Sequence, residues 1–427
     1  MRKPAIALSP RAVNRVRFAA ILGVLGPGLV SGFADNDAGG ISTYSVAGVK
    51  YGYELLWVLL ASQVVLFFTQ EVGARLGLAT GQGLTGLVRE RFGVRWVTFL
   101  TITMLIANVG SIVAEFAGTA AALSLFHVAA PVSAAIAATV VILLITRGSF
   151  GKVQYLFVFV GIGVSLAYFA SALMSHPDWG TAFHSLIVPS GNPSAAYWLT
   201  VVATVGTTIT PWGQAFIQSY CADKRLGPED LIGERLDVGL GALLTNLIAA
   251  FIVVACAAGL WSHHIVIDTS SPTAVADIAR ALAPLAGEGA TVLFAIGLLA
   301  ASFLGLGVVP LTSAYAACEA FGWETGVDWR LRDAPAFYGL IIFFIVIAAF
   351  FVLIPGLPLV QVMFMAQVVN ALLLPFVLVF VMVLASDKKL MGPLVSGRFL
   401  QVVGWGGTGL LVLLSITLAW SSFFAPA

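Results

Sequence analysis

Residues 26–48 read GPGLVSGFADNDAGGISTYSVAG, a mostly apolar run with two acidic residues near its centre. Two aspartates, Asp35 and Asp37, fall midway along an otherwise apolar segment and are followed at once by Gly39 and Gly40. A carboxylate in the middle of a membrane span costs roughly 2.5 to 3.5 kcal/mol, so it persists only where it faces a wet cavity or a partner. The stretch therefore predicts a membrane span that is interrupted for a functional reason.

The paired glycines predict that the helix unwinds at this point. Each weakens a helix by about 1 kcal/mol relative to alanine, and unwound backbone at membrane depth is tolerated only inside the protein or beside a cavity. Carboxylate oxygens and exposed carbonyl oxygens together favour a hard cation. The competing interpretation pairs Asp35 and Asp37 with a buried Lys or Arg, but no basic residue lies in the middle of any predicted span.

A second interruption is predicted in residues 204–220, TVGTTITPWGQAFIQSY. Pro211 removes a backbone donor and disfavours helical geometry at Thr210, and Gly213 loosens the following turn. The carbonyl groups of residues 207–210 are then left to face a substrate. Two broken helices in corresponding positions of two five-span halves are typical of inverted-repeat transporters with a site at the middle of the membrane.

The composition agrees with a protein that lies within the bilayer. Of 427 residues 59% are hydrophobic and 10% are charged, and the mean hydropathy is +1.00, whereas an average soluble domain is about 25% charged. The chain carries no intramembrane histidine and neither HExxH nor GxSxG, so we expect no enzyme activity and no cofactor. The expected partners are the lipid bilayer and a transported ion, with no nucleic acid, and the oligomeric state is left open.

Apolar windows of about 20 residues, the length that crosses the roughly 30 Å hydrocarbon core, predict an all-α protein of eleven spans. Residues 1–17 form a cytoplasmic segment, 18–174 a first repeat of five spans, 197–385 a second, inverted repeat, and 400–424 the last span. The spans are 18–50 (interrupted), 54–74, 96–125, 131–146, 153–174, 197–220, 237–261, 291–318, 336–354, 362–385 and 400–424.

The basic residues predict the orientation of these spans. If the N-terminus is cytoplasmic, all but Lys50 and Arg280 of the 21 Lys and Arg residues fall on the inner side, as the positive-inside rule requires. The C-terminus then lies outside. With an even number of spans the basic residues would be divided between the two sides of the membrane, so the positive-inside rule also supports an odd number of spans.

The two interruptions resemble those of the Nramp family of divalent-metal transporters, particularly the bacterial Nramp-related branch associated with magnesium and manganese. The family's Asp-Pro-Gly-Asn signature falls on residues 37–40, and its Ala-x-x-Met-Pro-His signature falls on residues 207–212. The string GTTITP, from Gly206, is typical of the magnesium-associated branch. The resemblance covers spans 1 to 10 and implies a LeuT-type 5+5 inverted repeat, alternating access and residence in a bacterial cytoplasmic membrane.

The departures from the family pattern imply a different choice of metal. Thr210 stands where the family has a methionine, so a hard oxygen donor replaces a thioether that favours softer metals. Gly40 replaces an asparagine ligand and frees volume for an ion that keeps several waters. We therefore expect Mg²⁺ and Mn²⁺ to be the transported ions.

The resemblance also implies which residues form the metal site. Asp37 would neutralise the charge of the ion and Asp35 would add to the field. Gln367 matches a glutamine that lines the family's site, although a buried glutamine that bridges helices is an equal alternative. The complete predicted set of metal-site residues is Asp35, Asp37, Gly40, Thr207, Thr210 and Gln367, with helix-breaking residues Gly39, Pro211 and Gly213.

The family's proton relay is incomplete in this sequence. Ile112 and Trp212 replace an aspartate and a histidine, and only Glu115 remains, which implies transport without strong proton coupling. Glu115 either belongs to a remnant of the relay or neutralises a polar partner such as Asn108 or a bound water. The alternative function is an amine or amino-acid transporter of the same fold, in which Asp37 pairs with a substrate ammonium.

Overall fold

The structure is a computed structural model that describes residues 26–147, 150–191, 194–265, 267–271, 273–283, 287–326, 329 and 331–424. The predicted cytoplasmic segment, residues 1–17, and the start of the first predicted span lie outside these residues. All regular elements in the described residues are helices, as the sequence predicted.

The long helices follow the predicted spans closely. The helices with one uninterrupted run are α4 (Leu56–Thr80), α6 (Val94–Ser124), α7 (Ala130–Thr146), α8 (Phe150–Met174), α12 (Leu231–Gly259), α15 (Ala290–Phe321), α16 (Pro335–Val352), α17 (Leu359–Ser386) and α19 (Arg398–Phe424). Shorter helices at the two ends of the molecule are α5 (Leu84–Phe92), α9 (Trp179–Ile187), α13 (Ala274–Ala279) and α18 (Lys388–Met391).

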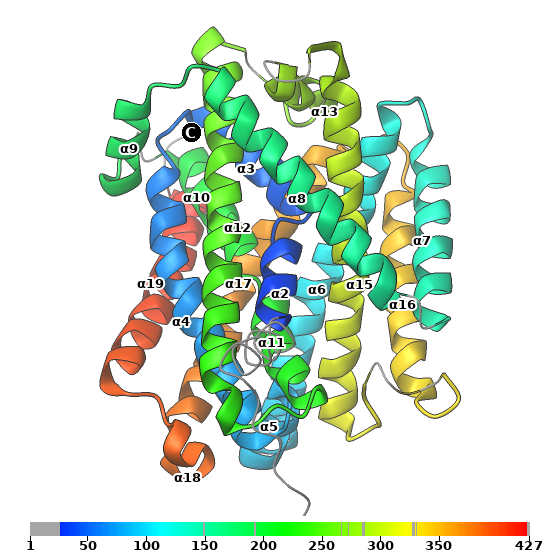
Figure 1. The fold of residues 1–427 in the computed structure, drawn as a ribbon, viewed down its shortest axis with the longest axis vertical. Helices are drawn as coiled ribbons and strands as arrows, with labels where there is room; N and C mark the ends of the chain where they lie inside the picture. The colour runs from blue at the N-terminus through cyan, green and yellow to red at the C-terminus, as the bar shows by residue number, and fades with distance from the viewer. Residues whose placement is uncertain are drawn as a thin grey trace, which may run out of the picture.

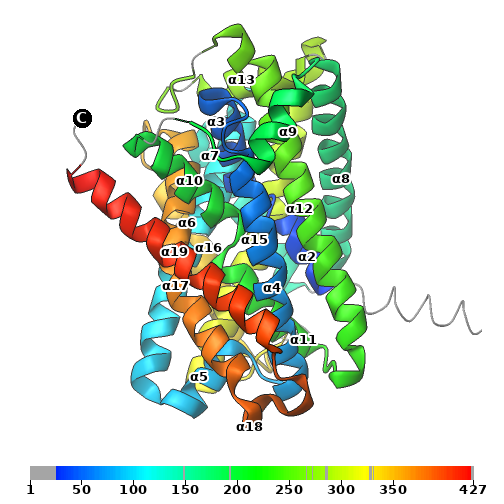
Figure 2. The same ribbon diagram turned by 90° about the vertical axis from the view of Figure 1, so that its left-hand side faces the viewer.

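Two spans are broken into half-helices, as predicted. The first consists of α2 (Pro27–Ala34) and α3 (Ala38–Tyr51), and the second of α10 (Ala195–Thr208) and α11 (Pro211–Asp223). In both Figure 1 and Figure 2, α3 lies above α2 and α10 lies above α11, so that both breaks fall in the interior of the molecule.

The helices pack in two groups around these breaks. In the first group, α12 packs against α2, α3 and α4, and α4 packs against α11. In the second group, α6 packs most extensively against α15 and α17. The half-helices α3 and α10 contact α17, so the breaks lie where the two groups meet.

The outer surface of the molecule is that of a membrane protein. Among the described residues, seven helices are long and apolar enough to cross a membrane, while the broken spans, α7 and Ser165–Met174 of α8 are shorter runs. Large apolar side chains such as Phe343, Val346 and Phe350 of α16 are exposed, and an apolar surface of this extent requires lipid or a protein partner. The exact number of eleven spans stays a prediction.

Charged residues gather at the two ends of the helices. The helices α5 and α18, which carry Arg89, Arg91, Lys388 and Lys389, lie together at the lower end, and α13 lies at the opposite end (Figure 2). An ion pair between Arg91 and Asp387 joins α5 to the start of α18. This contact holds the pKa of the Asp387 carboxyl below its ordinary value.

Glu71 of α4 forms ion pairs with two arginines. The Arg75 guanidinium lies 2.9 Å from Glu71 Oε1, and Arg235 of α12 contacts the same oxygen at 2.6 Å. Glu71 therefore joins α4 to α12 within the first group of helices.

Candidate functional site

The first break consists of Asp35, Asn36 and Asp37, between α2 and α3. Asp37 is the N-cap of α3, because its Oδ1 accepts a hydrogen bond from the backbone N–H of Gly40 at 2.6 Å. A carboxylate at this position satisfies a free N–H and interacts favourably with the helix dipole. The predicted position of the unwinding, at Gly39 and Gly40, is wrong: both residues lie in the first turn of α3, because the Asp37 cap lets the helix begin before them.

The second break is formed by Ile209 and Thr210, between α10 and α11. Pro211 is the first residue of α11, where its missing N–H costs nothing, and Thr210 is the N-cap. The Thr210 hydroxyl accepts a hydrogen bond from the N–H of Gly213 at 3.1 Å. The break at Pro211 agrees with the prediction, whereas Gly213 lies within the first turn of α11.

Three oxygen atoms converge on the space where Gly40 lacks a side chain. A Cβ atom at Gly40 would lie 3.0 Å from the carbonyl oxygen of Asp35, 3.1 Å from Thr207 Oγ1 and 3.3 Å from Asp37 Oδ1. Within the described part of the chain, Thr207 Oγ1 and the second carboxylate oxygen of Asp37 have no hydrogen-bond partner. We call this group of three oxygens the oxygen cradle. It brings together ligands from both broken spans.

Gln367 of α17 lies at the edge of the oxygen cradle. A side chain at Gly39 would overlap Gln367 Nε2, and its Cβ would lie 3.3 Å from Asp37 Oδ1. The Gln367 side chain is fully buried, and its nitrogen has no hydrogen-bond partner among the described residues. The glycine thus admits an amide group from a distant helix next to the carboxylate.

The carboxylate of Asp35 makes a different contact from that of Asp37. Its Oδ1 accepts a hydrogen bond from the Thr210 hydroxyl at 3.1 Å, so this pair ties the first break to the second. A side chain at Gly213 would press on both groups, since its Cβ would lie 2.8 Å from Thr210 Oγ1 and 3.4 Å from Asp35 Oδ1. Thr210, predicted as a metal-site residue, caps α11 and binds Asp35, and its hydroxyl is not one of the three oxygens of the oxygen cradle.

Glu115 of α6 lies on the other side of the α3 N-terminus. Its Oε2 accepts a hydrogen bond from the N–H of Ala38 at 3.3 Å, and its carboxyl group lies beside that of Asp37. Asn108, the polar partner considered for Glu115, instead donates to Ser313 Oγ at 3.0 Å. Glu115 therefore contacts the first residue of α3, directly beside the break.

The charge of this region is negative. Asp35, Asp37 and Glu115 are at most 1% exposed, and none of the ion pairs among the described residues includes them. The carbonyl ends of α2 and α10, which carry partial negative charge, also terminate at the breaks. Buried carboxylates without a resident basic partner need a mobile positive charge or a proton.

The donor set of the oxygen cradle is a mixture of different oxygen atoms. No group of three or more His, Cys, Asp or Glu residues in the described part of the chain is placed to hold a metal ion. The oxygen cradle instead mixes a carboxylate, a carbonyl and a hydroxyl, the oxygen ligands that hard cations such as Mg²⁺ and Mn²⁺ prefer.

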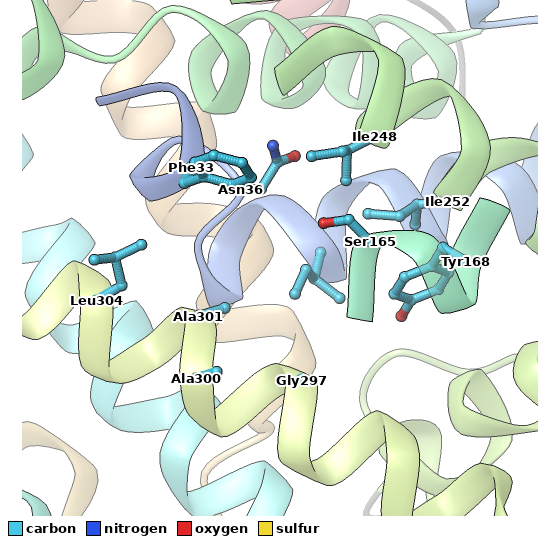
Figure 3. Close-up of a pocket in the computed structure, with 11 residues that line it drawn as sticks. Phe33, Asn36, Ser165, Tyr168, Ile248, Ile252, Gly297, Ala300, Ala301 and Leu304 are labelled. Carbon is cyan, nitrogen blue, oxygen red and sulfur yellow. The ribbon is translucent and has the colours of Figure 1, made fainter. Parts of the chain in front are cut away.

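A small cavity of about 30 Å³ lies beside the first break, and roughly 10 to 15 Å³ is enough for one water molecule. Asn36 Oδ1 and the Tyr168 hydroxyl have no hydrogen-bond partner among the described residues. Figure 3 shows the wall formed by α15 opposite these polar groups, with its labelled residues Gly297, Ala300, Ala301 and Leu304. The break can therefore be hydrated from this side.

Polar side chains that were not predicted from the sequence surround the predicted residues. Asn370 donates to Gln367 Oε1 at 2.9 Å, and Gln70 of α4 donates to Ser31 Oγ of α2 at 3.4 Å. Each is an amide in the middle of an apolar span, and that placement was the available signal. Their partners could not be identified, because the partners come from other helices.

Comparison with known proteins identifies the family that this chain matches. Residues 28–421 match the family described as natural resistance-associated macrophage protein-like, or Nramp. The chain is 28% identical to the divalent metal cation transporter MntH of Burkholderia ambifaria, over 96% of this chain and 91% of that protein. It is 27% identical to the protein of the same name from Deinococcus radiodurans, again over 96% and 91%.

Solved structures show the same fold. A manganese transporter of Eremococcus coleocola, crystallised with an aromatic bis-isothiourea compound, superimposes with a TM-score of 0.76 at 21% identity, covering 96% of this chain and 90% of that chain. MhsT in complex with L-phenylalanine superimposes with a TM-score of 0.65 at 14% identity, covering 93% and 98%.

Proposed function

The chain belongs to the Nramp family, and on that premise we propose that it transports divalent metal cations across a bacterial membrane. The observation that carries the proposal is the oxygen cradle, in which atoms of Asp35, Asp37 and Thr207 surround the vacant position at Gly40. Two relatives named divalent metal cation transporters, aligned over 96% of the chain, support the same substrate class.

The proposed ions are Mg²⁺ and Mn²⁺. The oxygen cradle offers only oxygen atoms. At the position that resembles the family's methionine, Thr210 binds Asp35, so this position supplies no thioether. Hard oxygen ligands favour Mg²⁺ and Mn²⁺ over softer metals. The small cavity beside Asn36 adds room for water, which suits Mg²⁺ because this ion retains several of its waters.

The proposed mechanism is alternating access. The breaks lie between the two groups of helices. Movement of α2–α3 and α10–α11 together with α4 and α12 would expose the ion to one side of the membrane and then to the other. Asp37 supplies the main neutralising charge. Glu115 and Asp35 add to the field, and Gln367 contributes an amide oxygen when its side chain is suitably turned.

Proton coupling is proposed to be weak. Ile112 and Trp212 occupy two positions of the relay that the family resemblance implies, and neither side chain titrates. Glu115 could exchange a proton with Asp37, whose carboxyl group is adjacent. Side chains that carry no exchangeable acid or base at the other two relay positions support weak coupling.

The alternative substrate, an amine or amino acid, fits this geometry less well. In the described structure a single carbon atom at Gly40 would already approach three oxygens within 3.3 Å, so the oxygen cradle has the dimensions of one atom. An amino-acid carboxylate would also be repelled by the buried Asp35 and Asp37.

The test is metal uptake into liposomes that contain the purified protein, a metal-sensitive dye and a pH-sensitive dye. We expect Mn²⁺ and Mg²⁺ to enter with little acidification. Asp37→Asn, which keeps a capping oxygen for Gly40 but removes the charge, should reduce uptake to the level of protein-free liposomes. Asp268→Asn, in an exposed loop, is the control. Unchanged uptake in the Asp37 variant would refute the site, and uptake of amines in place of metals would refute the function.

A further inference from the structure

The amide group of Gln367 has two different environments. Its oxygen accepts a hydrogen bond from Asn370 Nδ2 at 2.9 Å, while its nitrogen points toward Gly39 at the edge of the oxygen cradle. An amide nitrogen offers no lone pair to a cation, whereas the amide oxygen offers two. In this orientation Gln367 cannot be a metal ligand, and it becomes one only when its amide turns over.

Asn370 is placed to control that turn. It lies three residues after Gln367 on α17, and its Nδ2 also donates to Ser111 Oγ of α6 at 2.9 Å. The Ser111 hydroxyl lies 3.3 Å from Asn370 Oδ1, to which it can donate. All three side chains are fully buried, so no bulk water competes for these hydrogen bonds.

The same three side chains can form a second, equally complete network. The two ends of an amide have almost the same shape, so a half-turn exchanges oxygen and nitrogen without a change in volume. After a half-turn of both amides, Asn370 Oδ1 accepts from Gln367 Nε2 and Asn370 Nδ2 donates to Ser111, whose hydroxyl can accept. Gln367 Oε1 then faces the oxygen cradle.

We propose that Asn370, supported by Ser111, is a positioning residue that determines which end of the Gln367 amide faces the transported ion. This inference rests on the proposed function, and it identifies a residue that sets the affinity of the site for the transported ion. Groups that hydrogen-bond to a metal ligand fix its orientation, and their loss lowers metal affinity about 10- to 100-fold. Asn370 touches no reacting group and acts only through Gln367.

The experiment is a double-mutant cycle on Mn²⁺ binding, measured by calorimetry on the purified full chain, with uptake kinetics in liposomes beside it. Asn370→Leu should raise the dissociation constant and the KM about 10- to 100-fold and leave the maximal rate unchanged. Gln367→Leu should have a similar effect. The double variant should bind no more weakly than Gln367→Leu alone, because Asn370 has nothing left to orient.

Two further variants separate positioning from a general structural effect. Asn108→Leu is the matched control, because it removes a buried hydrogen bond of α6, to Ser313 at 3.0 Å, without a contact to Gln367. It should leave Mn²⁺ affinity unchanged. Ser111→Ala removes only the far partner, and should weaken binding in the same direction by a smaller factor, again with no effect when Gln367 is Leu.

The outcomes distinguish this inference from the proposed function. If wild-type protein binds Mn²⁺ but the losses of Asn370→Leu and Gln367→Leu multiply in the double variant, the positioning role is overturned and the function stands. Equal losses in Asn108→Leu would also overturn it. If wild-type protein binds no divalent metal, both fail. Should Asn370→Leu not fold, Ser111→Ala completes the cycle with the same criterion.

Discussion

At the scale of single residues, the absent side chain of Gly40 matters as much as the charged ones around it. Asp37 Oδ1, Thr207 Oγ1 and the Asp35 carbonyl surround a space that any Cβ atom would enter. The neighbouring Gly39 has the same role toward Gln367. These glycines are therefore required for room rather than for flexibility, since both lie in regular helix.

This interpretation predicts that Gly40→Ala separates stability from transport. Alanine favours helix over glycine by about 1 kcal/mol, and its contacts of 3.0 to 3.3 Å are tight but can be relieved by small shifts. We expect the unfolding temperature to change little, while Mn²⁺ affinity falls at least about tenfold because the methyl group occupies part of the ion's space. Calorimetry and thermal unfolding of the same preparation measure the two quantities.

The matched control is Gly339→Ala in α16, where the added methyl group meets no atom within 4 Å. It should leave both affinity and transport unchanged. Full Mn²⁺ affinity in Gly40→Ala would show that the ion does not occupy the oxygen cradle.

At the scale of the helices, α2 is held to α12 along its whole length. The Asp237 carboxylate accepts hydrogen bonds from the N–H groups of Gly28 and Leu29 at the start of α2. Two turns further along α12, the Thr245 hydroxyl donates to the Gly32 carbonyl. A helix of only eight residues has little stability of its own, so these contacts with α12 determine its position.

The close approach of α2 and α12 predicts the effect of Gly241→Ala. A Cβ atom at Gly241 would collide with the backbone of Gly28, which cannot move aside as a side chain could. We expect a loss of about 1 to 3 kcal/mol from overpacking, larger than the gain in helix propensity, and reduced transport because α2 is displaced. Gly239→Ala, on the same helix, meets only the side chain of Phe67 at 3.2 Å.

Thermal unfolding and Mn²⁺ uptake should therefore separate the two variants. Gly239→Ala should resemble wild type, and Gly241→Ala should be the less stable and less active. Equal stability of both would mean that α2 and α12 are not in backbone contact.

The helices were largely predictable, because membrane spans depend on local composition. Asp35, Asp37 and Pro211 marked both broken spans. The position of unwinding was less predictable, because it depends on the hydrogen bond from the N–H of Gly40 to the Asp37 carboxylate. The paired glycines favoured a break at their own positions instead. Thr210 was predicted as a metal-site residue, and nothing in the sequence indicated that its hydroxyl also accepts a hydrogen bond from the N–H of Gly213.

The surroundings of the site could not be predicted, because they depend on which face each helix presents to its neighbours. Glu115 was predicted as a relay remnant or as the partner of a polar group, yet nothing in the sequence links its carboxyl group to the N–H of Ala38. Asn370 and Ser111 are separated by 259 residues and share hydrogen bonds in the structure. A single sequence contains no measure of such pairing.

At the scale of the whole molecule, the distribution of charge predicts the orientation in the membrane. The helices α5 and α18, with Arg89, Arg91, Lys388 and Lys389, lie at one end, and α13, which precedes Arg280, lies at the other (Figure 1). Because basic segments are retained on the cytoplasmic side, the end with α5 and α18 should face the cytoplasm. The loop that leads into α13 should then face outward.

Cysteine labelling of intact cells tests this orientation. The native Cys221, Cys256 and Cys318 are buried, so a thiol introduced at an exposed position is labelled over a low background. A membrane-impermeant maleimide should react with Ser270→Cys, in the loop before α13, in intact cells. It should react with Lys389→Cys, in α18, only after the membrane is opened. The reverse pattern would place α5 and α18 outside and would contradict the predicted orientation.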